Sequence, residues 1–599
     1  MITLGLNAAF HDSAAALVVD GVTIAAAEEE RFSRIKHGKR PVPFSAWELP
    51  FNAIDFCLRE ADIDIGDVDH IAYSFDALHF LGDRAHLLDL PALPLDLGAA
   101  ASEAWETPWD PLFATYVIQA PRQLVDGVPH HLRRRLQLNG KATRFQWHSV
   151  HHHTCHQASA FLAAPFESCA VLTLDGRGER SSTAYGIYRD DSYRSLGEVP
   201  VPHSLGILYE RVTSHLGFLH SSDEYKVMAL AALGMPRFRE VLREHVRVGE
   251  DGRFTVADFD MAAVFGPPRL PGTPLEEHHL DLAASLQDVL EETTLQLAAW
   301  LRQVSGEKFL AMAGGVALNC LMNSRIRDSG LFDAVWVQPA AGDAGTALGA
   351  ALWVDARERL LAEEATTGVV QGKPAANAHA IPLAPRRWRM DNVYLGPGYD
   401  DKEIEDFLRW AKLPYQKLQD VAETTAHLLA SNRVIGWFQG RMEFGPRALG
   451  ARSILASPID SEMQARMNEL KDREDFRPVA PAIPEEDLAE WFGPASANGG
   501  ASPFMLFVYD VLPGKRQRIP SACHTDHTAR VQTVGAAANP RFHALLRAFG
   551  RITGVPVLIN TSFNVRGEPI VCSPRDAVES FYSTPLDALV IGSFLLEKS

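Results

Sequence analysis

Two histidines and an aspartate are the first residues whose types and spacing suit chemistry. His152 and His156 stand four residues apart in a run of histidines, and the alanine-rich residues that follow favour a helix. One face of such a helix presents both imidazoles, which can share a metal ion with a carboxylate such as Asp175. His153 and His156 could also share a face, so the spacing favours His152 without excluding His153. The alternative is a histidine-rich helix start on the surface, or a core helix with one hydrogen-bonded histidine.

Two further polar residues are expected where turns follow strands. Asp343 stands in a Gly-Asp-Ala-Gly turn after the expected strand Ala334–Gln338, and α/β sheets gather ligand-binding groups at such strand ends. Together with Asp175 and the two histidines, it makes a set that suits iron(II), manganese or zinc. As alternatives, Asp343 caps the next helix and Asp175 belongs to a hairpin turn. His11, in the first turn, could act as a general base on a hydroxyl, or it hydrogen-bonds to Asp12 as a turn residue.

Glycines and arginines indicate sites for anions. Gly314 and Gly315 before a helix would let the backbone pass close to a nucleotide, although this pair is also common in ordinary turns. Arg441, Arg447 and Arg452 stand among glycines. Further polar groups follow in the same region, namely Lys471, Arg473, Arg477, Arg530 and Asn560–Asn564. Guanidinium groups bind phosphate oxygens in pairs, so this cluster predicts a small-anion site, with ordinary surface salt bridges as the alternative.

An α/β framework is expected to position these residues. Apolar runs separated by a polar turn occur twice, about 165 residues apart, and predict a repeated strand–turn–strand unit at Ile2–Leu6 with Ala14–Val19 and at Cys169–Leu174 with Ser182–Tyr188. Two similar subdomains of this kind make a cleft suited to a nucleotide. Strand–glycine-turn–helix units then follow at Phe309–Asn323 and at Ala334–Ala356, which indicates an α/β core.

The chain is long enough for two or three domains. We predict a first domain over residues 1–360, a linker over 361–395 that is rich in alanine, proline, threonine and glycine, and a second α/β domain over 396–599 beginning with a helix at Asp401–Ala411. The apolar, proline-punctuated segment Leu81–Pro121 is expected to be an insertion, either part of an acceptor pocket or a lid.

Composition narrows the class of partner and the compartment. The net charge is −18, and proteins that grip nucleic acid usually carry a basic face, so an RNA substrate is disfavoured and a neutral or cationic small acceptor is compatible. The six cysteines are scattered without a CxxC pair, which suits a reducing cytoplasm. We expect neither a membrane-spanning segment nor a signal peptide.

Several segments together resemble the O-carbamoyltransferase family that includes nodulation protein U and the cephamycin, novobiocin and tobramycin carbamoyltransferases. The matching stretches run in family order and include FHDSAAALVVDG, HHTCHQASAF, LDGRGE, MAGGVALNCLMN, QPAAGDAGTALGAAL, GRMEFGPRALGARS and INTSFNVRGEPIVCSP. The resemblance implies an N-terminal domain of the actin/ribonuclease-H-like, threonylcarbamoyl-transferase type and a C-terminal YrdC-like domain that forms carbamoyl adenylate.

The resemblance also implies site residues and substrates. The family's metal ligands fall on His152, His156, Asp175 and Asp343, with iron(II) as the expected ion, and its proposed catalytic histidine falls on His11. The carbamoyl-phosphate site falls on Arg447, Arg452, Lys471, Arg530 and Ser562, and the nucleotide lies near Gly314, Gly315 and Asn319. Mg-ATP and carbamoyl phosphate are the implied co-substrates, and the acceptor is a small hydroxylated molecule, as in natural-product tailoring and antibiotic biosynthesis.

One departure and three alternatives accompany this resemblance. The family usually has glycine where this chain has His527, after Asp526; His527 either reshapes the phosphate site slightly or is simply tolerated in the turn. A metalloprotease would explain the paired histidines, but the sequence has no HExxH. A threonylcarbamoyl-type tRNA modification enzyme shares both domain types but acts on RNA. A non-catalytic nucleotide-binding protein would not need both the metal and the carbamoyl-phosphate residues.

Overall fold

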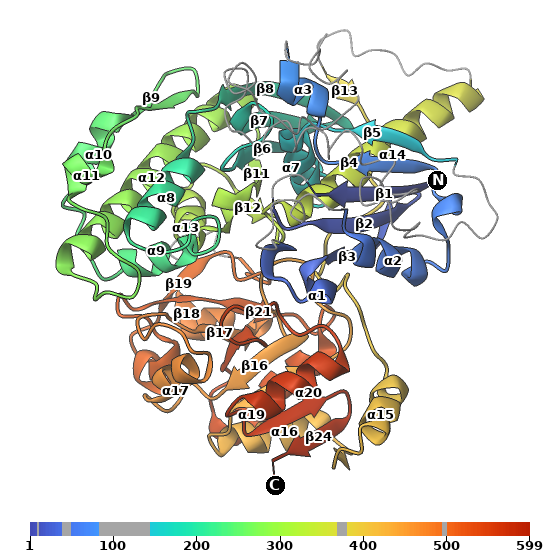
Figure 1. Cartoon of the computed structure of the whole chain (residues 1–599), viewed down its shortest axis with the longest axis vertical. Coiled ribbons are helices and arrows are strands. Elements are labelled where there is room, and N and C mark those ends of the chain that lie inside the picture. Colours follow the sequence, from blue (N-terminus) through green and yellow to red (C-terminus); the bar gives the residue numbers. More distant parts are fainter. Residues whose placement is uncertain (9–10, 39–48, 83–143, 368–379, 494–499, 599) are drawn as a thin grey trace, which may run out of the picture. The chain divides into compact units, whose positions relative to one another are not determined.

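The computed structural model divides into two compact units (Figure 1). It describes residues 1–8, 11–38, 49–82, 144–367, 380–493 and 500–598. The first unit is Met1–Val201 with Ala311–Gly315 and Ala340–Met390, and the second is Pro202–Leu310 with Val316–Pro339 and Asp391–Ser599. The expected insertion lies outside the described residues from residue 83 onward, as do residues 368–379 of the expected linker.

The first sheet of the first unit begins with the predicted hairpin. Its order is β3-β2-β1-β4-β5, with bounds β1 Ile2–Asn7, β2 Ala14–Val19, β3 Val22–Glu28, β4 His70–Tyr73 and β5 Gln146–Ser149. β1 pairs antiparallel with β2 and parallel with β4. Asp20 and Gly21 join β2 to β3 with positive φ values of 47° and 84°, which is the backbone of a tight type I′ turn.

A second sheet in the same unit confirms the predicted repeat. The order β8-β7-β6-β11 repeats the order β3-β2-β1-β4 of the first sheet, and β13 borders β8. The bounds are β6 Cys169–Leu174, β7 Ser181–Arg189, β8 Ser192–Pro200, β11 Phe309–Ala313 and β13 Ile381–Pro382. β6 and β7 pair antiparallel, as β1 and β2 do. The strand that precedes each turn therefore ends in an equivalent place in both halves.

Two helices of the first unit pack closely: α7 (His152–Phe161) and α14 (Ala344–Thr367). A methyl group on Gly349 of α14 would lie only 1.8 Å from the carbonyl oxygen of Cys155 on α7, so glycine permits this approach. α14 extends beyond the predicted end at Ala356, and the first seven residues of the expected linker are therefore helical.

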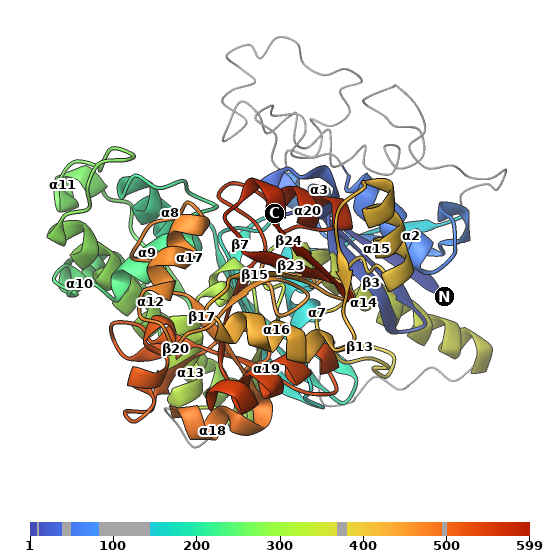
Figure 2. The same ribbon diagram turned by 90° about the horizontal axis from the view of Figure 1, so that it is seen from below.

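The second unit contains an eight-stranded mixed sheet in the order β14-β24-β23-β15-β16-β22-β17-β21. Its strands β15, β17, β23 and β24 are labelled in Figure 2. The bounds are β14 Gln416–Lys417, β15 Ile435–Phe438, β16 Arg452–Ala456, β17 Ala480–Pro484, β21 Gln532–Val534, β22 Leu558–Ser562, β23 Ala588–Ile591 and β24 Phe594–Glu597. Helices α16 (Val421–Ala430) and α19 (Pro540–Thr553) lie side by side, and their apolar faces share a core with Trp437 and Leu558 of the sheet. The predicted helix near Asp401 is present as α15 (Asp401–Trp410).

The remaining part of the second unit contains helices and two small sheets, one of β9 (Val246–Val248) with β10 (Phe254–Val256) and one of β18 (Phe492–Gly493), β19 (Val508–Val511) and β20 (Thr528–Arg530). The helices include α8 (Leu205–His215), α9 (Glu224–Ala231), α12 (Glu277–Ser305) and α13 (Cys320–Asp328), with α12 against α9 and α13. Along the described parts of the chain, none of the helices combines the length and the hydropathy needed to cross a bilayer.

Candidate active site

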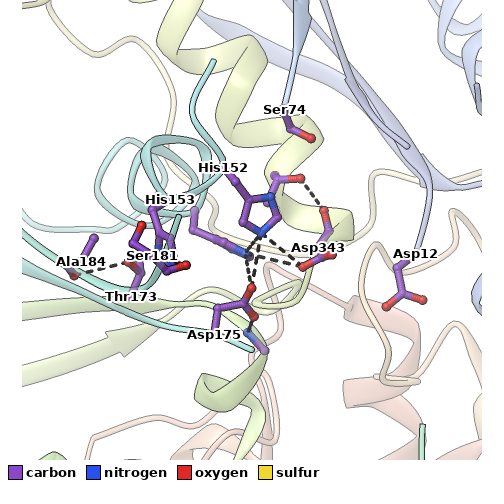
Figure 3. Close-up of polar contacts among 12 residues, drawn as sticks. Asp12, Ser74, His152, His153, Thr173, Asp175, Ser181, Ala184 and Asp343 are labelled. Atoms are coloured by element: carbon purple, nitrogen blue, oxygen red, sulfur yellow. Dashed lines mark hydrogen bonds and ion pairs between the residues drawn. The ribbon is translucent and has the colours of Figure 1, made fainter. Parts of the chain in front are cut away.

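Four buried side chains of the first unit converge on one point. His152 and His156 lie on α7, Asp175 follows β6, and Asp343 directly precedes α14. The Nε2 atoms of the two histidines are 3.1 Å apart. His152 Nε2 lies 3.3 Å from Asp175 Oδ2 and 3.6 Å from Asp343 Oδ1, and the corresponding distances from His156 Nε2 are 3.8 and 3.7 Å. Figure 3 shows both carboxylates pointing toward His152.

The distances within this cluster fit a divalent metal ion. Two ligand atoms that each lie about 2.1 Å from one ion, at angles between about 90° and 110°, are separated by roughly 3.0 to 3.5 Å. The two Nε2 atoms and the nearest carboxylate oxygens have about this spacing. Imidazole nitrogen with carboxylate oxygen is also a donor set that iron(II), manganese and zinc all accept. The residues therefore fit a metal, although the donor set does not select one of the three.

Opposite charges stabilise the side chains of this cluster against the cost of burial. Burial lowers the pKa of His152, but Asp343 and Asp175 outweigh burial and raise that pKa well above its usual value. Burial likewise raises the pKa of Asp175, but hydrogen bonds and charge from His152 and His156 bring it well below the usual range. The pKa of Asp343 is also lowered, by His11 and His152 against the effect of burial. A divalent cation could replace the proton that this environment favours on His152.

Neighbouring groups fix how the side chains of this cluster are oriented. Glu179 accepts hydrogen bonds from His152 N at 2.9 and 3.0 Å, and one of its oxygens also accepts from Asp76 N at 2.8 Å, so it anchors the first turn of α7. Gly315 N donates to Asp175 Oδ1 at 2.8 Å, while Asp175 Oδ2 faces the histidines. The sequence did not single out Glu179, although it closes the motif LDGRGE.

The adjacent histidines have other partners. His153 is buried, and its ring nitrogens lie 3.0 Å from Thr173 Oγ1 and 3.0 Å from the carbonyl oxygen of Ser181. Burial, and then the charge of His152, lower the pKa of His153 to about 3, so this ring is neutral. His151 Nε2 lies 3.5 Å from Asp76. Of the three consecutive histidines His151–His153, the structure therefore brings only His152 into the cluster with His156 and the carboxylates.

His11 lies beside the cluster. Its Nε2 is 3.8 Å from Asp343 Oδ2, while Asp343 Oδ1 faces the two histidines of α7. The Nδ1 atom of His11 is 2.9 Å from Asp12 Oδ2, which is the hydrogen bond expected of a turn histidine. That contact does not exclude a role as base, because it engages the ring nitrogen away from Asp343.

The second unit contains a cluster of arginines, which we call the arginine cluster: Arg447, Arg473 and Arg530. Burial, and then the charge of Arg530, lower the pKa of Arg447 to about 9, and burial with Arg477 and Arg530 does the same for Arg473. Within the described residues, Arg447 Nε, Arg473 Nη2 and Arg530 Nε are buried atoms without a hydrogen-bond partner. Partly buried, mutually repelling cations with unpaired donors are suited to an anion. The sequence marked Arg473 as part of the charged region but not as a site residue.

The other predicted anion ligands are in different environments. Arg452 is fully buried, its guanidinium donates to main-chain oxygens of Pro397, Gln439, Gly440, Ala451 and Cys572, and it lies 3.7 Å from the centre of the Phe438 ring. Lys471 and Ser562 do meet. Lys471 Nζ lies 2.5 Å from the carbonyl oxygen of Ser562 and 3.3 Å from its Oγ, and it also contacts Asn564.

The predicted nucleotide residues fall in both units. Gly314 has a φ of 93°, and a methyl group there would lie 2.2 Å from the carbonyl oxygen of Leu174, so close packing on β6 requires glycine. Asn319 caps α13 and exchanges hydrogen bonds with Gln287 in the second unit. His527 has a φ of 67°, which explains why glycine would suit this position.

Comparison with known proteins identifies the family. Residues 2–352 match the family model described as carbamoyltransferase N-terminus, and residues 426–598 match carbamoyltransferase C-terminus. The chain belongs to the carbamoyltransferase family. This carbamoyltransferase is 35% identical to nodulation protein NolNO of Sinorhizobium fredii, over 99% of this chain and 80% of that protein. It is 39% identical to nodulation protein NolO of Bradyrhizobium diazoefficiens, over 75% and 79% of the two chains.

Two further similarities, to an uncharacterized relative and to a solved structure, say nothing more about the reaction. An uncharacterized protein of Synechocystis, sll1178, is 38% identical over 100% of this chain and 96% of its own length. Among solved structures, this carbamoyltransferase resembles HypF of T. kodakarensis with a TM-score of 0.30 and 15% identity, over 59% of this chain and 47% of that one. We base no conclusion on a structural likeness at this level.

Proposed function

We propose that this carbamoyltransferase makes carbamoyl adenylate from carbamoyl phosphate and Mg-ATP and transfers the carbamoyl group to a hydroxyl of a small-molecule acceptor, such as a natural product. The observation that carries the proposal is the position of His11. Its Nε2 lies 3.8 Å from one oxygen of Asp343, and the other oxygen of Asp343 faces His152 and His156. A base therefore stands next to a cluster that fits a metal ion.

The first step would use the arginine cluster. Its unpaired donors suit the phosphate of carbamoyl phosphate, and positive charge there stabilises the phosphate as it leaves. Water would supply the oxygen that replaces phosphate on the carbamoyl carbon. The carbamate oxygen would then bond to the α-phosphorus of Mg-ATP while the bond to pyrophosphate breaks. Lys471 and Ser562, which contact each other, are proposed as further ligands in this unit.

The second step would use the first unit. His152, His156, Asp175 and Asp343 would hold a divalent metal, expected to be iron(II), which when bound supplies positive charge to phosphate oxygens of the adenylate. His11 Nε2 would take the proton of the acceptor hydroxyl. The hydroxyl oxygen would bond to the carbamoyl carbon, and AMP would leave with the electrons of the broken carbon–oxygen bond.

The proposed division of labour follows the expected domains. Residues 1–360 would form an actin-like transfer domain, and the repeated strand order of its two sheets supports this. Residues 396–599 would form a YrdC-like domain that makes the adenylate. Gly314, Gly315 and Asn319 would lie near the nucleotide, and Arg452, whose donors are already engaged by main-chain oxygens, would support the anion site from within the core.

Two measurements test the proposal. Mixing the protein with ATP, carbamoyl phosphate and iron(II) should release pyrophosphate only when both substrates are present. Mass spectrometry of a hydroxylated acceptor in the same mixture should show the gain of one carbamoyl group. Pyrophosphate release that needs threonine and bicarbonate in place of carbamoyl phosphate would favour a threonylcarbamoyl-type enzyme. Absence of pyrophosphate under all these conditions would contradict the proposal and favour a nucleotide-binding protein.

A further inference from the structure

The carboxylate of Asp12 lies between two imidazoles. Its Oδ2 is 2.9 Å from His11 Nδ1 and its Oδ1 is 2.9 Å from His37 Nδ1. Each oxygen of one side chain is therefore committed to a different histidine. In the other direction, His11 Nε2 approaches Asp343, so that a continuous series of polar groups runs from His37 to the proposed metal ligands.

The backbone that carries Asp12 is held firmly. The buried amide of Asn7, at the end of β1, donates to the carbonyl oxygens of His11 at 3.0 Å and Asp12 at 3.1 Å. Ser74, at the end of β4, donates to Asn7 Oδ1 at 2.9 Å, and Asp12 N donates to the carbonyl oxygen of His37 at 3.2 Å. Asp12 itself has a φ of 51°, a conformation that aspartate and asparagine tolerate better than other non-glycine residues. Two strand ends thus fix the position of one carboxylate.

A hydrogen bond to Nδ1 has a chemical consequence for His11. A neutral imidazole carries one proton, and an ionised carboxylate can only accept. The proton must therefore reside on Nδ1, and the lone pair is on Nε2, the nitrogen nearest Asp343. Burial raises the pKa of Asp12, but His11 and His37 outweigh burial and hold it well below the usual range, so the carboxylate is ionised.

A cation site is the competing explanation, because ligand atoms of Asp12, Glu30 and His37 lie within 4.8 Å of one another. However, Glu30 is engaged on both oxygens, by Arg31 Nη1 at 2.8 Å and by His37 N at 2.7 Å. Arg31 would also place a positive charge next to the ion. The contacts therefore favour a chain of hydrogen bonds.

We propose that Asp12 is a positioning residue that fixes the tautomer of His11, with Nδ1 protonated and Nε2 ready to accept a proton, and that His37 holds Asp12 in place for this purpose. The inference rests on the proposed role of His11 as the base for transfer. It adds that the same carboxylate determines which ring nitrogen can act.

Asp12→Asn tests the inference, since asparagine keeps the size of the side chain and tolerates the positive φ. In asparagine one of the two carboxylate oxygens becomes an NH₂ donor, so the side chain can no longer accept from both imidazoles; wherever the NH₂ faces His11, the proton of His11 must move to Nε2. ¹⁵N NMR of labelled histidines, assigned with His11→Gln, should show protonated Nδ1 in the wild type and protonated Nε2 in Asp12→Asn. The rate of carbamoyl transfer should fall by a factor on the order of 10² to 10⁴, with little change in the acceptor KM or in pyrophosphate release.

Variants of His37 distinguish a role in positioning Asp12 from a general loss of folded structure. His37→Asn places an amide N–H near the position of Nδ1, tolerates the φ of 60° and should retain most of the transfer rate, whereas His37→Leu should lose at least tenfold. His543, which pairs with Glu486 at 3.0 Å in the second unit, provides the control, and His543→Leu should transfer at the wild-type rate. A wild-type His11 protonated on Nε2, or full transfer by Asp12→Asn, would overturn the inference. A wild type that transfers no carbamoyl group refutes the proposed function instead, while the NMR result still decides the tautomer.

Discussion

Arg447 and Arg452 are five residues apart in one motif, yet we predict that their replacement by methionine changes stability in opposite directions. Arg452 donates to main-chain oxygens of several residues. Arg447 donates to the carbonyl oxygen of Leu318 at 3.2 Å, and its buried Nε has no hydrogen-bond partner among the described residues. One guanidinium is therefore engaged by the core, whereas the other keeps a buried donor without a partner among the described residues, as its proposed role in anion binding requires.

The pKa of Arg447 gives the size of the effect. Its fall from the ordinary arginine value to about 9 means that burial and Arg530 disfavour the charged form by up to about 5 kcal/mol, at about 1.36 kcal/mol per pH unit. Solvent screens part of this cost, and the bond to Leu318 offsets about 1 kcal/mol. We therefore expect Arg447→Met to raise the free energy of unfolding by about 1 to 3 kcal/mol. Arg452→Met should lower it by about 3 to 5 kcal/mol, since several buried carbonyls lose their donor.

Thermal and urea unfolding in phosphate-free buffer measure both changes. Each kcal/mol should move the Tm by roughly 2 to 4 °C in a domain of this size. Saturating carbamoyl phosphate should stabilise the wild type by about 2.7 kcal/mol at one hundred times its Kd, and it should have little effect on Arg447→Met. A destabilised Arg447→Met protein that carbamoyl phosphate still stabilises as much as the wild type would refute the reasoning.

The remaining predictions concern stability and metal content. Burial lowers the pKa of His524 to about 4, so only the unfolded chain takes up a proton on this side chain as the pH falls from 6.5 toward 4. The free energy of unfolding of the wild type should therefore fall by about 2 kcal/mol more between pH 7 and pH 5 than that of His524→Gln. Urea unfolding of both proteins at the two pH values measures this difference. Asp343→Asn should lower bound metal in elemental analysis, whereas His153→Asn should keep it; equal metal in both variants would contradict the assigned ligands. Glu179→Ala should cost about 1 to 3 kcal/mol and weaken metal binding by roughly 10- to 100-fold in a chelator competition, with Glu179→Gln less affected.

Local patterns were sufficient to predict four side chains that the fold brings together in one cluster. Helical spacing placed His152 and His156 on one face, and the ends of strands placed Asp175 and Asp343, because these rules depend only on nearby residues. The longer extent of α14 could also have been predicted, since no glycine or proline interrupts the chain between Ala351 and Thr367.

Other features depend on distant parts of the chain. Spacing alone could not exclude His153, because its partners lie on β6 and β7. The sequence could not predict that Arg447 and Arg452 lie in different environments either, because their hydrogen-bond partners are carbonyl groups from distant parts of the chain. His37 lies 25 residues from Asp12, and only the fold shows that they are bonded.

The close approach at Gly349 sets the spacing between the two helices that carry or adjoin the proposed metal ligands, although Gly349 is not itself a ligand. α7 carries both imidazoles, α14 begins directly after Asp343, and the two helices meet where a single hydrogen atom faces the Cys155 carbonyl. Adding one methyl group at this point would press the helices apart and widen the gap between nitrogen and oxygen donors. A substitution at Gly349 would therefore change which size of metal ion fits the proposed centre, although none of the four proposed ligands is replaced.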